Sequence, residues 1–222
     1  WYAWAWSPSP GHSMVLDPST HDRLEKYVRD MIGTFRDSPD ILVWDLYNEP
    51  SNMMDNRDAS LPLVRKVYLA AREENPPQPL TICFFGNREL QDFITAHSDI
   101  TTVHSYIPVD RLEALIEELK QYGRPIICTE WLNRPRGSLV ETVLPFFYRE
   151  QIGCMHWGLV NGKTQTHLPW GHRPGDLPYE GIWQHDLYTN DHREYSPYEI
   201  KLFKKYMTMS KTCLLYTSPS PR

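Results

Sequence analysis

Hydrophobic residues follow two alternating patterns along the chain. Short apolar runs, of which residues 41–46 (ILVWDL) are the first, are typical of parallel strands that are buried on both faces. Between these runs, apolar residues recur every three or four positions, as over residues 20–37, which predicts amphipathic helices. Ser19 and Asp22 predict a capping box at the start of that first helix.

The alternation predicts five strands separated by helices, which is typical of an α/β fold with a parallel sheet. The strands are expected at residues 41–46, 80–84, 100–104, 125–129 and 152–157, and the helices at 20–37, 61–74, 89–96, 110–121, 138–148 and 197–209. An open doubly wound sheet would usually carry a glycine-rich turn after an early strand. The chain has only 11 glycines and no such turn, so the pattern favours a (β/α)₈ barrel.

A complete barrel of this kind needs about 250 residues and eight strands. We therefore expect residues 1–212 to form an incomplete barrel domain, in which the strands equivalent to the fourth through eighth are present and the first three are missing. Such a half-barrel would expose the edges of its two outer strands and much apolar surface. Residues 213–222, CLLYTSPSPR, resemble a translated sequencing adapter, and we expect them to be a non-native tail.

Composition narrows the classes of function. Apolar residues make up 41% and charged residues 23% of the chain, which suits a folded domain. The net charge of −5 argues against a nucleic-acid partner, which would require a basic face. No apolar run approaches the roughly 18 residues of a membrane span, so no membrane partner is expected. Eight tryptophans and 13 tyrosines suggest flat ligands with apolar faces.

Two glutamates follow predicted strands at positions where barrels carry their active sites. The first strand leads into Asn48 and Glu49, and the fourth leads into Glu130. Barrel active sites lie at the carboxyl ends of the strands, and three strands on is roughly across the mouth. Two carboxyl groups that face each other over a groove are what glycosidic cleavage needs. One must donate a proton and the other must be ionised.

The candidate substrate-binding residues are polar or aromatic side chains near the same strand ends. An asparagine can both donate to and accept from a sugar hydroxyl, and an indole face can stack on a sugar ring. His104 and Tyr106 are two residues apart and share a face of their strand, so they could bond the sugar or Glu130. The candidates are Asn48, His104, Tyr106, Trp131, Trp157 and Trp170, with His172 and Trp183 as further subsite or lid residues in the long loop over 158–195.

With these residues in place, the sequence resembles a glycoside hydrolase of clan A, closest to family 5-like cellulases and mannanases. The stretches WDLYNEP, GRPIICTEW and WGLVNGKTQT look like bacterial sequences labelled cellulase-family or 1,4-β-xylanase. The resemblance implies a retaining hydrolase of β-linked oligo- or polysaccharides, without cofactor or metal. Glu49 would be its acid/base and Glu130 its nucleophile. His104 and Tyr106 resemble the sixth-strand His-x-Tyr, and Trp157 the eighth-strand tryptophan.

The resemblance has one departure with a consequence for activity. Family members carry an arginine on the second strand that supports the nucleophile, and that strand is among those expected to be missing. We therefore expect the parent protein to be a glycosidase and this chain by itself to be inactive.

Three other classes of function compete with a glycosidase. A non-catalytic carbohydrate-binding protein on the same barrel would keep the aromatic residues and lose one carboxylate, whereas both are present. A metal-dependent hydrolase needs converging ligands; His104 and His156 lie at strand ends, but no HxH or HExxH spacing occurs. A structural or interaction module is the third. The sugar, its linkage, endo or exo action and the oligomeric state are left open by the sequence.

Overall fold

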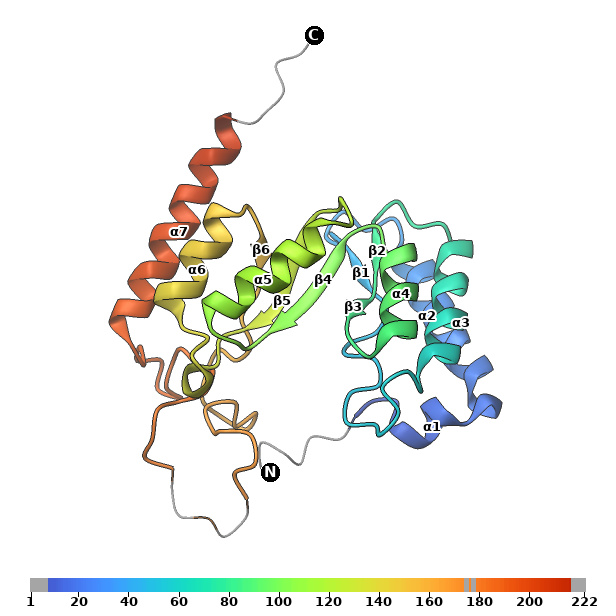
Figure 1. Ribbon diagram of the computed structural model, residues 1–222, viewed down its shortest axis with the longest axis horizontal. Coiled ribbons are helices and arrows are strands. Elements are labelled where there is room, and N and C mark those ends of the chain that lie inside the picture. The colour runs from blue at the N-terminus through green and yellow to red at the C-terminus, as the bar shows by residue number, and fades with distance from the viewer. Residues whose placement is uncertain (1–7, 174–175, 177–178, 217–222) are drawn as a thin grey trace. The chain divides into compact units, whose positions relative to one another are not determined.

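The computed structural model describes residues 8–173, 176 and 179–216, with side chains described up to residue 211 (Figure 1). The chain divides into two compact units. Among the described residues, one unit comprises 8–104 and 119–127, and the other comprises 105–118 and the residues from 128 onward.

The first unit combines helices with short parallel strands, as the alternating pattern predicts. Strand β1 pairs in parallel with β2, with Trp44 opposite Leu80, and β3 pairs in parallel with β4. In chain order its elements are α1 (His12–Leu16), a 3₁₀ turn η1 (Pro18–Thr20), α2 (His21–Phe35), β1 (Trp44–Asp45), α3 (Leu61–Glu73), β2 (Leu80–Thr81), β3 (Cys83–Phe84), α4 (Arg88–His97) and β4 (Thr101–Ser105).

The remaining elements continue the alternation of helix and strand. They are α5 (Val109–Lys120), β5 (Ile126–Trp131), a 3₁₀ turn η2 (Arg134–Arg136), α6 (Val140–Arg149), β6 (Gly153–Cys154) and α7 (Pro197–Tyr216). The longer sheet follows the order β3-β4-β5-β6, which is also the order of its strands along the chain. The predicted α/β class with parallel strands is therefore confirmed. The predicted helices are present with shifted ends, as are four of the five predicted strands. The strand predicted at 80–84 is divided into β2 and β3, which belong to different sheets.

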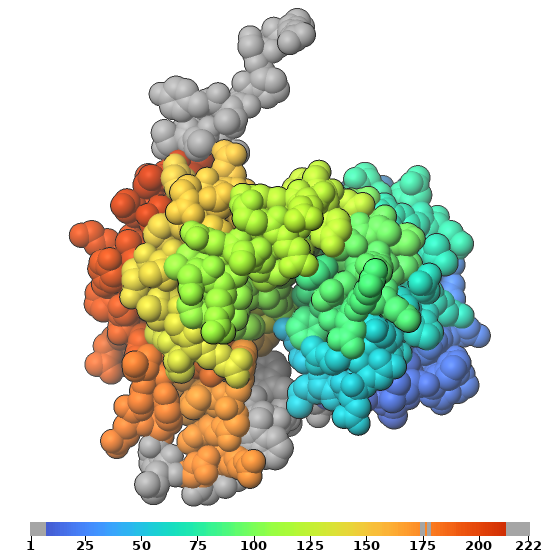
Figure 2. Space-filling view, in the orientation of Figure 1, coloured from blue at the N-terminus to red at the C-terminus, as the bar shows by residue number. Residues whose placement is uncertain are grey.

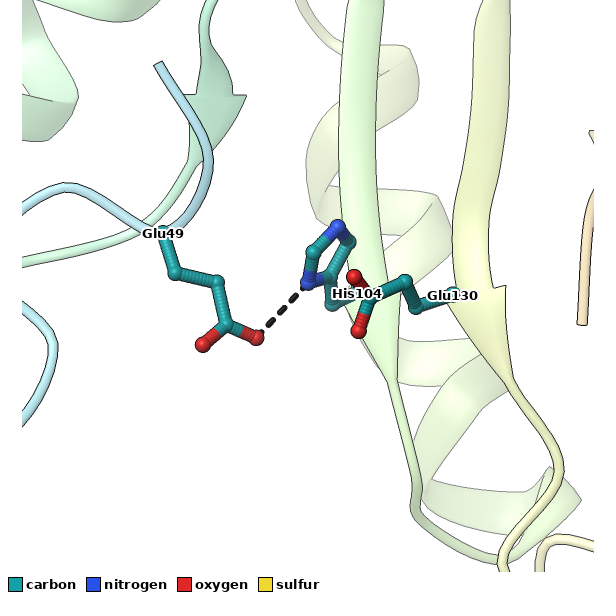
Figure 3. A group of neighbouring side chains, drawn as sticks. All are labelled: Glu49, His104 and Glu130. Carbon is teal, nitrogen blue, oxygen red and sulfur yellow. Dashed lines mark hydrogen bonds and ion pairs between the residues drawn. The ribbon is translucent and has the colours of Figure 1, made fainter. Parts of the chain in front are cut away.

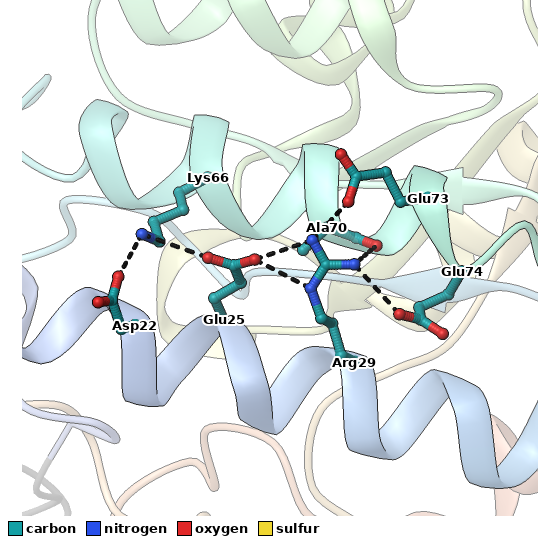
Figure 4. A network of polar contacts seen from close by, with 7 residues as sticks. All are labelled: Asp22, Glu25, Arg29, Lys66, Ala70, Glu73 and Glu74. Atoms are coloured by element: carbon teal, nitrogen blue, oxygen red, sulfur yellow. Dashed lines mark hydrogen bonds and ion pairs between the residues drawn. The ribbon is translucent and has the colours of Figure 1, made fainter.

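Helices α2 and α3 pack together over a small apolar core and are linked by charges at its edge. Val15, Leu63 and Val67 form the buried part of this core. Arg29 on α2 forms ion pairs with Glu25 on its own helix, with Glu73 at the end of α3 and with Glu74, the C-cap of α3 (Figure 4). These carboxylates raise the pKa of Arg29, so its charge is retained at any ordinary pH.

The central strands are buried and the outer strands are not. In β2 and β3 every residue is buried, as a continuous apolar run predicts. Beside β1, however, Leu42 is 74% exposed, and just after β6 Met155 is 51% exposed. Among the described residues β1 pairs only with β2, and β6 ends its sheet. Both outer strands thus expose apolar side chains, as expected for an open sheet.

Helices α6 and α7 lie side by side, as the yellow and red surfaces in Figure 2 show. Tyr148 on α6 contacts Tyr206 on α7 with ring centroids 5.3 Å apart. Ile200 is 3% exposed, so the amino-terminal half of α7 holds this helix in place. No helix in the described part of the chain is both long and apolar enough to cross a membrane.

Two local predictions need correction or comment. The capping box of Ser19 and Asp22 is wrong: the Asp17 carboxylate accepts from the Ser19 N–H at 2.9 Å, and η1 precedes the helix. Asp17 adopts an extended conformation, and its carboxylate accepts from both the N–H and the hydroxyl of Ser19. Helix α7 runs to Tyr216, so the first residues of the predicted tail continue it, and residues 217–222 lie outside the described part.

Candidate active site

Glu49 lies in a sharp turn four residues after β1. Its φ angle of 40° is in the left-handed region, which costs a side-chain-bearing residue about 1–3 kcal/mol. The N–H of Asn52 donates to the Glu49 carbonyl at 3.0 Å, and the Asn52 amide donates to Glu49 Oε2 at 2.5 Å. The buried Ser51 hydroxyl forms a hydrogen bond with the Ser60 hydroxyl at 2.7 Å, which ties the turn to the residue just before α3. The surrounding contacts therefore hold a strained residue and fix its carboxyl group.

The other oxygen of this carboxyl group faces His104, near the end of β4. His104 Nδ1 lies 2.7 Å from Glu49 Oε1 (Figure 3). The His104 side chain is only 4% exposed and that of Glu49 18% exposed. The donor in this hydrogen bond is either the Nδ1–H group of His104 or the O–H of a protonated Glu49 carboxyl. This arrangement suits a residue that gives and takes a proton. The sequence had linked His104 to the sugar or Glu130 and did not predict this bond.

Glu130 lies in β5, and its carboxylate is held by a tyrosine. The Tyr106 hydroxyl donates to Glu130 Oε2 at 2.6 Å, the bond that the sequence had suggested for Tyr106. Hydrogen bonds to an ionised acceptor are about twice as strong as neutral ones, so this donor favours the carboxylate form. Two residues on, Leu132 has a φ of 78° while fully buried, and the chain leaves the strand through a second strained turn.

Two aromatic rings contact the Tyr106 ring. The Tyr106 ring meets Trp170 edge-on, with centroids 4.9 Å apart, and lies 5.3 Å from the His185 ring. Trp170 and His185 are themselves 5.5 Å apart. His185 is buried, whereas Trp170 is 43% exposed. The predicted loop tryptophan is thus brought to the side of the residue that holds Glu130, and it keeps a solvent-facing surface.

A chain of hydrogen bonds fixes Trp170 there. His185 Nδ1 donates to the Leu132 carbonyl at 2.5 Å, so Nε2 accepts from the Gln184 amide at 2.6 Å. The side-chain oxygen of Gln184, Oε1, in turn accepts a hydrogen bond from the Trp170 backbone N–H at 2.9 Å. Burial lowers the pKa of His185 to about 4, which keeps the ring neutral at pH 7 and preserves this pattern.

Sequence reasoning missed Asn52, Gln184 and His185 as supports of the site. Asn52 could have been found from its place three residues after Glu49, where a side chain can reach back across a turn. Gln184 and His185 carry no such signal. His185 bonds a carbonyl that is 53 positions away in the sequence.

The remaining predicted residues divide between surface and core. Asn48 is exposed beside Glu49, and Trp157 is partly exposed, with its N–H bonded to the Trp131 carbonyl at 3.0 Å. Trp131 itself is 0% exposed and packs against Phe147 at a centroid distance of 5.7 Å. Adjacent residues of a strand point to opposite faces, so Glu130 and Trp131 cannot both face a ligand. The assignment of Trp131 to substrate binding does not fit this placement, and we withdraw it.

The two loop residues named as subsite or lid candidates also differ from Trp170. Trp183 is stacked on Tyr195, with centroids 4.6 Å apart and rings inclined by 12°. His172 lies next to Tyr179, at 6.2 Å between ring centroids. Of the three loop candidates, only Trp170 contacts Tyr106 within the described residues.

Comparison with known proteins gives the fold a context. No family model matches the sequence, and no curated protein matches it either. Solved structures do. The chain shares the fold of parts of several glycoside hydrolases.

One is a β-glucuronidase of Faecalibacterium prausnitzii, with 17% identity and a TM-score of 0.59 over 85% of this chain and 35% of the other. A second is the Bifidobacterium dentium β-glucuronidase complexed with coumarin-3-O-glucuronide, at 17% identity and a TM-score of 0.61, covering 87% and 34% of the two chains.

A third is a GH2 β-galacturonidase of Eisenbergiella tayi bound to galacturonate, at 16% identity and a TM-score of 0.61, covering 86% and 37%. The chain therefore spans about a third of the length of these structures. At these identities the likeness establishes the fold. It gives no specific support to the family 5-like assignment.

Proposed function

We propose that this chain is part of a retaining glycoside hydrolase that cleaves β-linked sugars with two glutamates. The carrying observation is the Glu130 carboxylate bonded by the Tyr106 hydroxyl at 2.6 Å, because an oriented, ionised carboxylate is what a glycosidase nucleophile must be. The proposal includes a (β/α)₈ barrel in which β1 to β6 supply the later strands. It is supported by the parallel strands and by the fold shared with β-glycosidases.

The proposed first step forms a glycosyl-enzyme. A Glu130 oxygen attacks the anomeric carbon and the bond from that carbon to the leaving oxygen breaks. Glu49 passes its proton to the leaving oxygen. In the second step Glu49 takes a proton from water, the water oxygen attacks the anomeric carbon, and Glu130 leaves as a carboxylate.

The hydrogen bond between Glu49 and His104 supports the acid/base role. His104 Nδ1, 2.7 Å away, stabilises the carboxylate that remains after proton donation. Asn52 holds the second oxygen, so the group that exchanges protons stays in one orientation. Asn48 beside it is exposed and can bond a sugar hydroxyl.

The substrate part of the proposal is broader than the sequence resemblance. The clan A, family 5-like resemblance suggests β-linked glucans, xylans or mannans. The solved structures with this fold are named for glucuronides and galacturonides. We therefore propose a β-linked sugar as substrate and include both neutral sugars and uronides in its test.

The test uses the protein completed with the preceding barrel strands that the mechanism requires, since the chain alone is expected to be inactive. Aryl β-glycosides are assayed with the unchanged protein and with Glu49→Gln and Glu130→Gln. Glu113→Gln, an exposed glutamate on α5, serves as the matched control. We expect both site variants to lose at least a thousandfold in kcat, the control to be unchanged, and the first product by NMR to keep the β configuration.

Other outcomes of these experiments would contradict the proposed mechanism or the proposed function. Activity that survives Glu130→Gln excludes this residue as the nucleophile. An inverted product excludes the covalent mechanism, which needs carboxyl groups about 5 to 5.5 Å apart rather than the wider spacing of inverting enzymes. Loss of activity with a chelator would indicate a metal-dependent hydrolase. Sugar binding without cleavage would favour the non-catalytic carbohydrate-binding protein.

A further inference from the structure

The guanidinium of Arg136 lies over the ring of Trp170, the exposed tryptophan of the site. Its guanidinium carbon is 4.7 Å from the centroid of the Trp170 ring, in a cation–π arrangement. Both side chains are exposed. Trp170 in turn contacts Tyr106, whose hydroxyl bonds Glu130. The positive charge of Arg136 is therefore connected through Trp170 to Tyr106, the residue that bonds the proposed nucleophile.

The guanidinium of Arg136 forms no ion pair within the described part of the chain. No carboxylate among those residues lies within 4.0 Å of its guanidinium, although the molecule has an excess of acidic residues. Arg134, two positions earlier in the same turn, is the opposite case. It is buried, and its guanidinium bonds both oxygens of Glu199 at 2.8 and 2.6 Å. One arginine of the pair is structural and the other is presented to solvent.

The presentation is rigid. Asn133 caps η2 by accepting the Arg136 N–H at 3.2 Å, which fixes the backbone of the arginine. Gln184 and His185 fix the backbone of Trp170 from the other side. Both supports, Asn133 and Gln184, are buried, so the backbone positions of Arg136 and Trp170 are fixed from within the fold.

We infer that Arg136 and Trp170 form a subsite for a carboxylate on the substrate sugar, which makes the preferred substrate a β-linked uronide. A guanidinium stacked on an indole keeps its N–H donors at the free edge of its plane. Such an edge makes two parallel hydrogen bonds to a planar carboxylate. A net charge of −5 repels anions in general, so an anionic substrate requires a local cation of this kind. The inference rests on the proposed function and specifies its substrate.

The experiment measures discrimination between an anionic and a neutral sugar. In the completed enzyme, kcat/KM is measured for 4-nitrophenyl β-glucuronide, 4-nitrophenyl β-glucoside and its 6-sulfate. Arg136→Gln and Arg136→Lys are compared with Arg149→Gln, which removes the same charge from an exposed site on α6. We expect the ratio of glucuronide to glucoside kcat/KM to fall at least tenfold in Arg136→Gln, to fall less in Arg136→Lys, and to stay the same in Arg149→Gln.

A binding measurement separates this inference from the proposed function. Calorimetry with free glucuronate, glucose and glucose 6-sulfate is run on the same variants. Binding of glucuronate that is lost in Arg136→Gln supports the subsite even if no glycoside is cleaved. Hydrolysis of glucosides with a ratio that Arg136→Gln leaves unchanged overturns the subsite and leaves the glycosidase standing. Stronger binding of the 6-sulfate than of glucuronate identifies a sulfate subsite and overturns the uronide.

Discussion

The Tyr106 hydroxyl donates a 2.6 Å hydrogen bond to Glu130, and the edge of the same ring contacts Trp170. One side chain thus connects the proposed nucleophile on β5 with a loop residue 40 positions later. The phenol can orient the carboxylate only while its ring is packed, and Trp170 is packed by the hydrogen bonds of Gln184 and His185. The chemistry of β5 consequently depends on the order of the long loop.

Replacing Tyr106 with phenylalanine removes this donor and keeps the ring. We expect kcat/KM of the completed enzyme on aryl β-glycosides to fall about ten- to a hundredfold, because a hydrogen bond to a charged group contributes about 1.5–3 kcal/mol. Steady-state kinetics checks the prediction. Tyr27→Phe, on the exposed surface of α2, is the matched control and should have no effect. Unchanged kinetics in Tyr106→Phe would show that the hydroxyl does not support the nucleophile.

The buried Arg134–Glu199 ion pair ties η2 to α7. Arg134 also donates to the carbonyls of Trp183 and Asp186 at 3.0 and 3.1 Å. Arg134→Met should lower the free energy of unfolding by about 3–5 kcal/mol, since it leaves the Glu199 charge buried without its partner. Urea unfolding followed by tryptophan fluorescence measures the loss.

The double variant Arg134→Met, Glu199→Met provides the internal check. It should be less destabilised than the sum of the single variants, because removing the second charge relieves the first. Arg149→Met, which breaks an exposed ion pair, should barely shift the unfolding midpoint. Additive losses would mean that the two charges do not interact.

His185 makes stability depend on pH. Burial lowers its pKa from 6.5 to about 4, so the unfolded chain binds a proton more readily than the folded one. The stabilisation is complete above pH 6.5, and it is lost as the pH falls from 6.5 toward 4. Over this window His185 should account for about 3 kcal/mol. Burial lowers the pKa of His156 as well, so this residue contributes a loss of the same sign as the pH falls.

The contribution of His185 is measured by comparing the pH dependence of the free energy of unfolding in His185→Gln with that in the unchanged protein. Denaturant unfolding between pH 4 and pH 7 should have a shallower pH dependence in His185→Gln than in the unchanged protein. His192→Asn, at an exposed residue with a φ of 64° that asparagine tolerates, should retain the full dependence. Parallel curves for all three proteins would contradict the assignment to His185.

Deleting residues 213–222 should leave the fold unchanged. Among the described side chains, the contacts that hold α7 lie in its first half, where Glu199 pairs with Arg134 and Phe203 contacts Trp131 at 5.8 Å. We expect the thermal midpoint to shift by no more than about 1 °C, as measured by circular dichroism. Shortening the helix further, to residue 202, removes Phe203 and should lower the midpoint clearly. A large loss from the first deletion would make residues 213–222 part of the native protein.

The elements of this protein were predictable because their signals are local. The helix over Leu61–Glu73 and the strand over Thr101–Ser105 follow from apolar spacing within a dozen residues. The two glutamates were also predictable, because their places after apolar runs put them at strand ends. The exposure of individual side chains was less predictable. The run ILVWDL is typical of a buried strand, yet Leu42 is exposed because, among the described residues, β1 has a paired neighbour on one side only.

The sequence by itself determined the class of fold and the positions of the two glutamates near strand ends, and it named Tyr106 as one candidate donor to Glu130. Only the tertiary structure decided which tryptophan is available to a ligand. Trp131 and Trp170 are the same residue type beside the same strand end, but the alternation of β5 turns the first into the core and a bond from Gln184 holds the second at the surface. Such selection depends on contacts between residues distant in sequence, such as His185 with Leu132, and no local pattern encodes them.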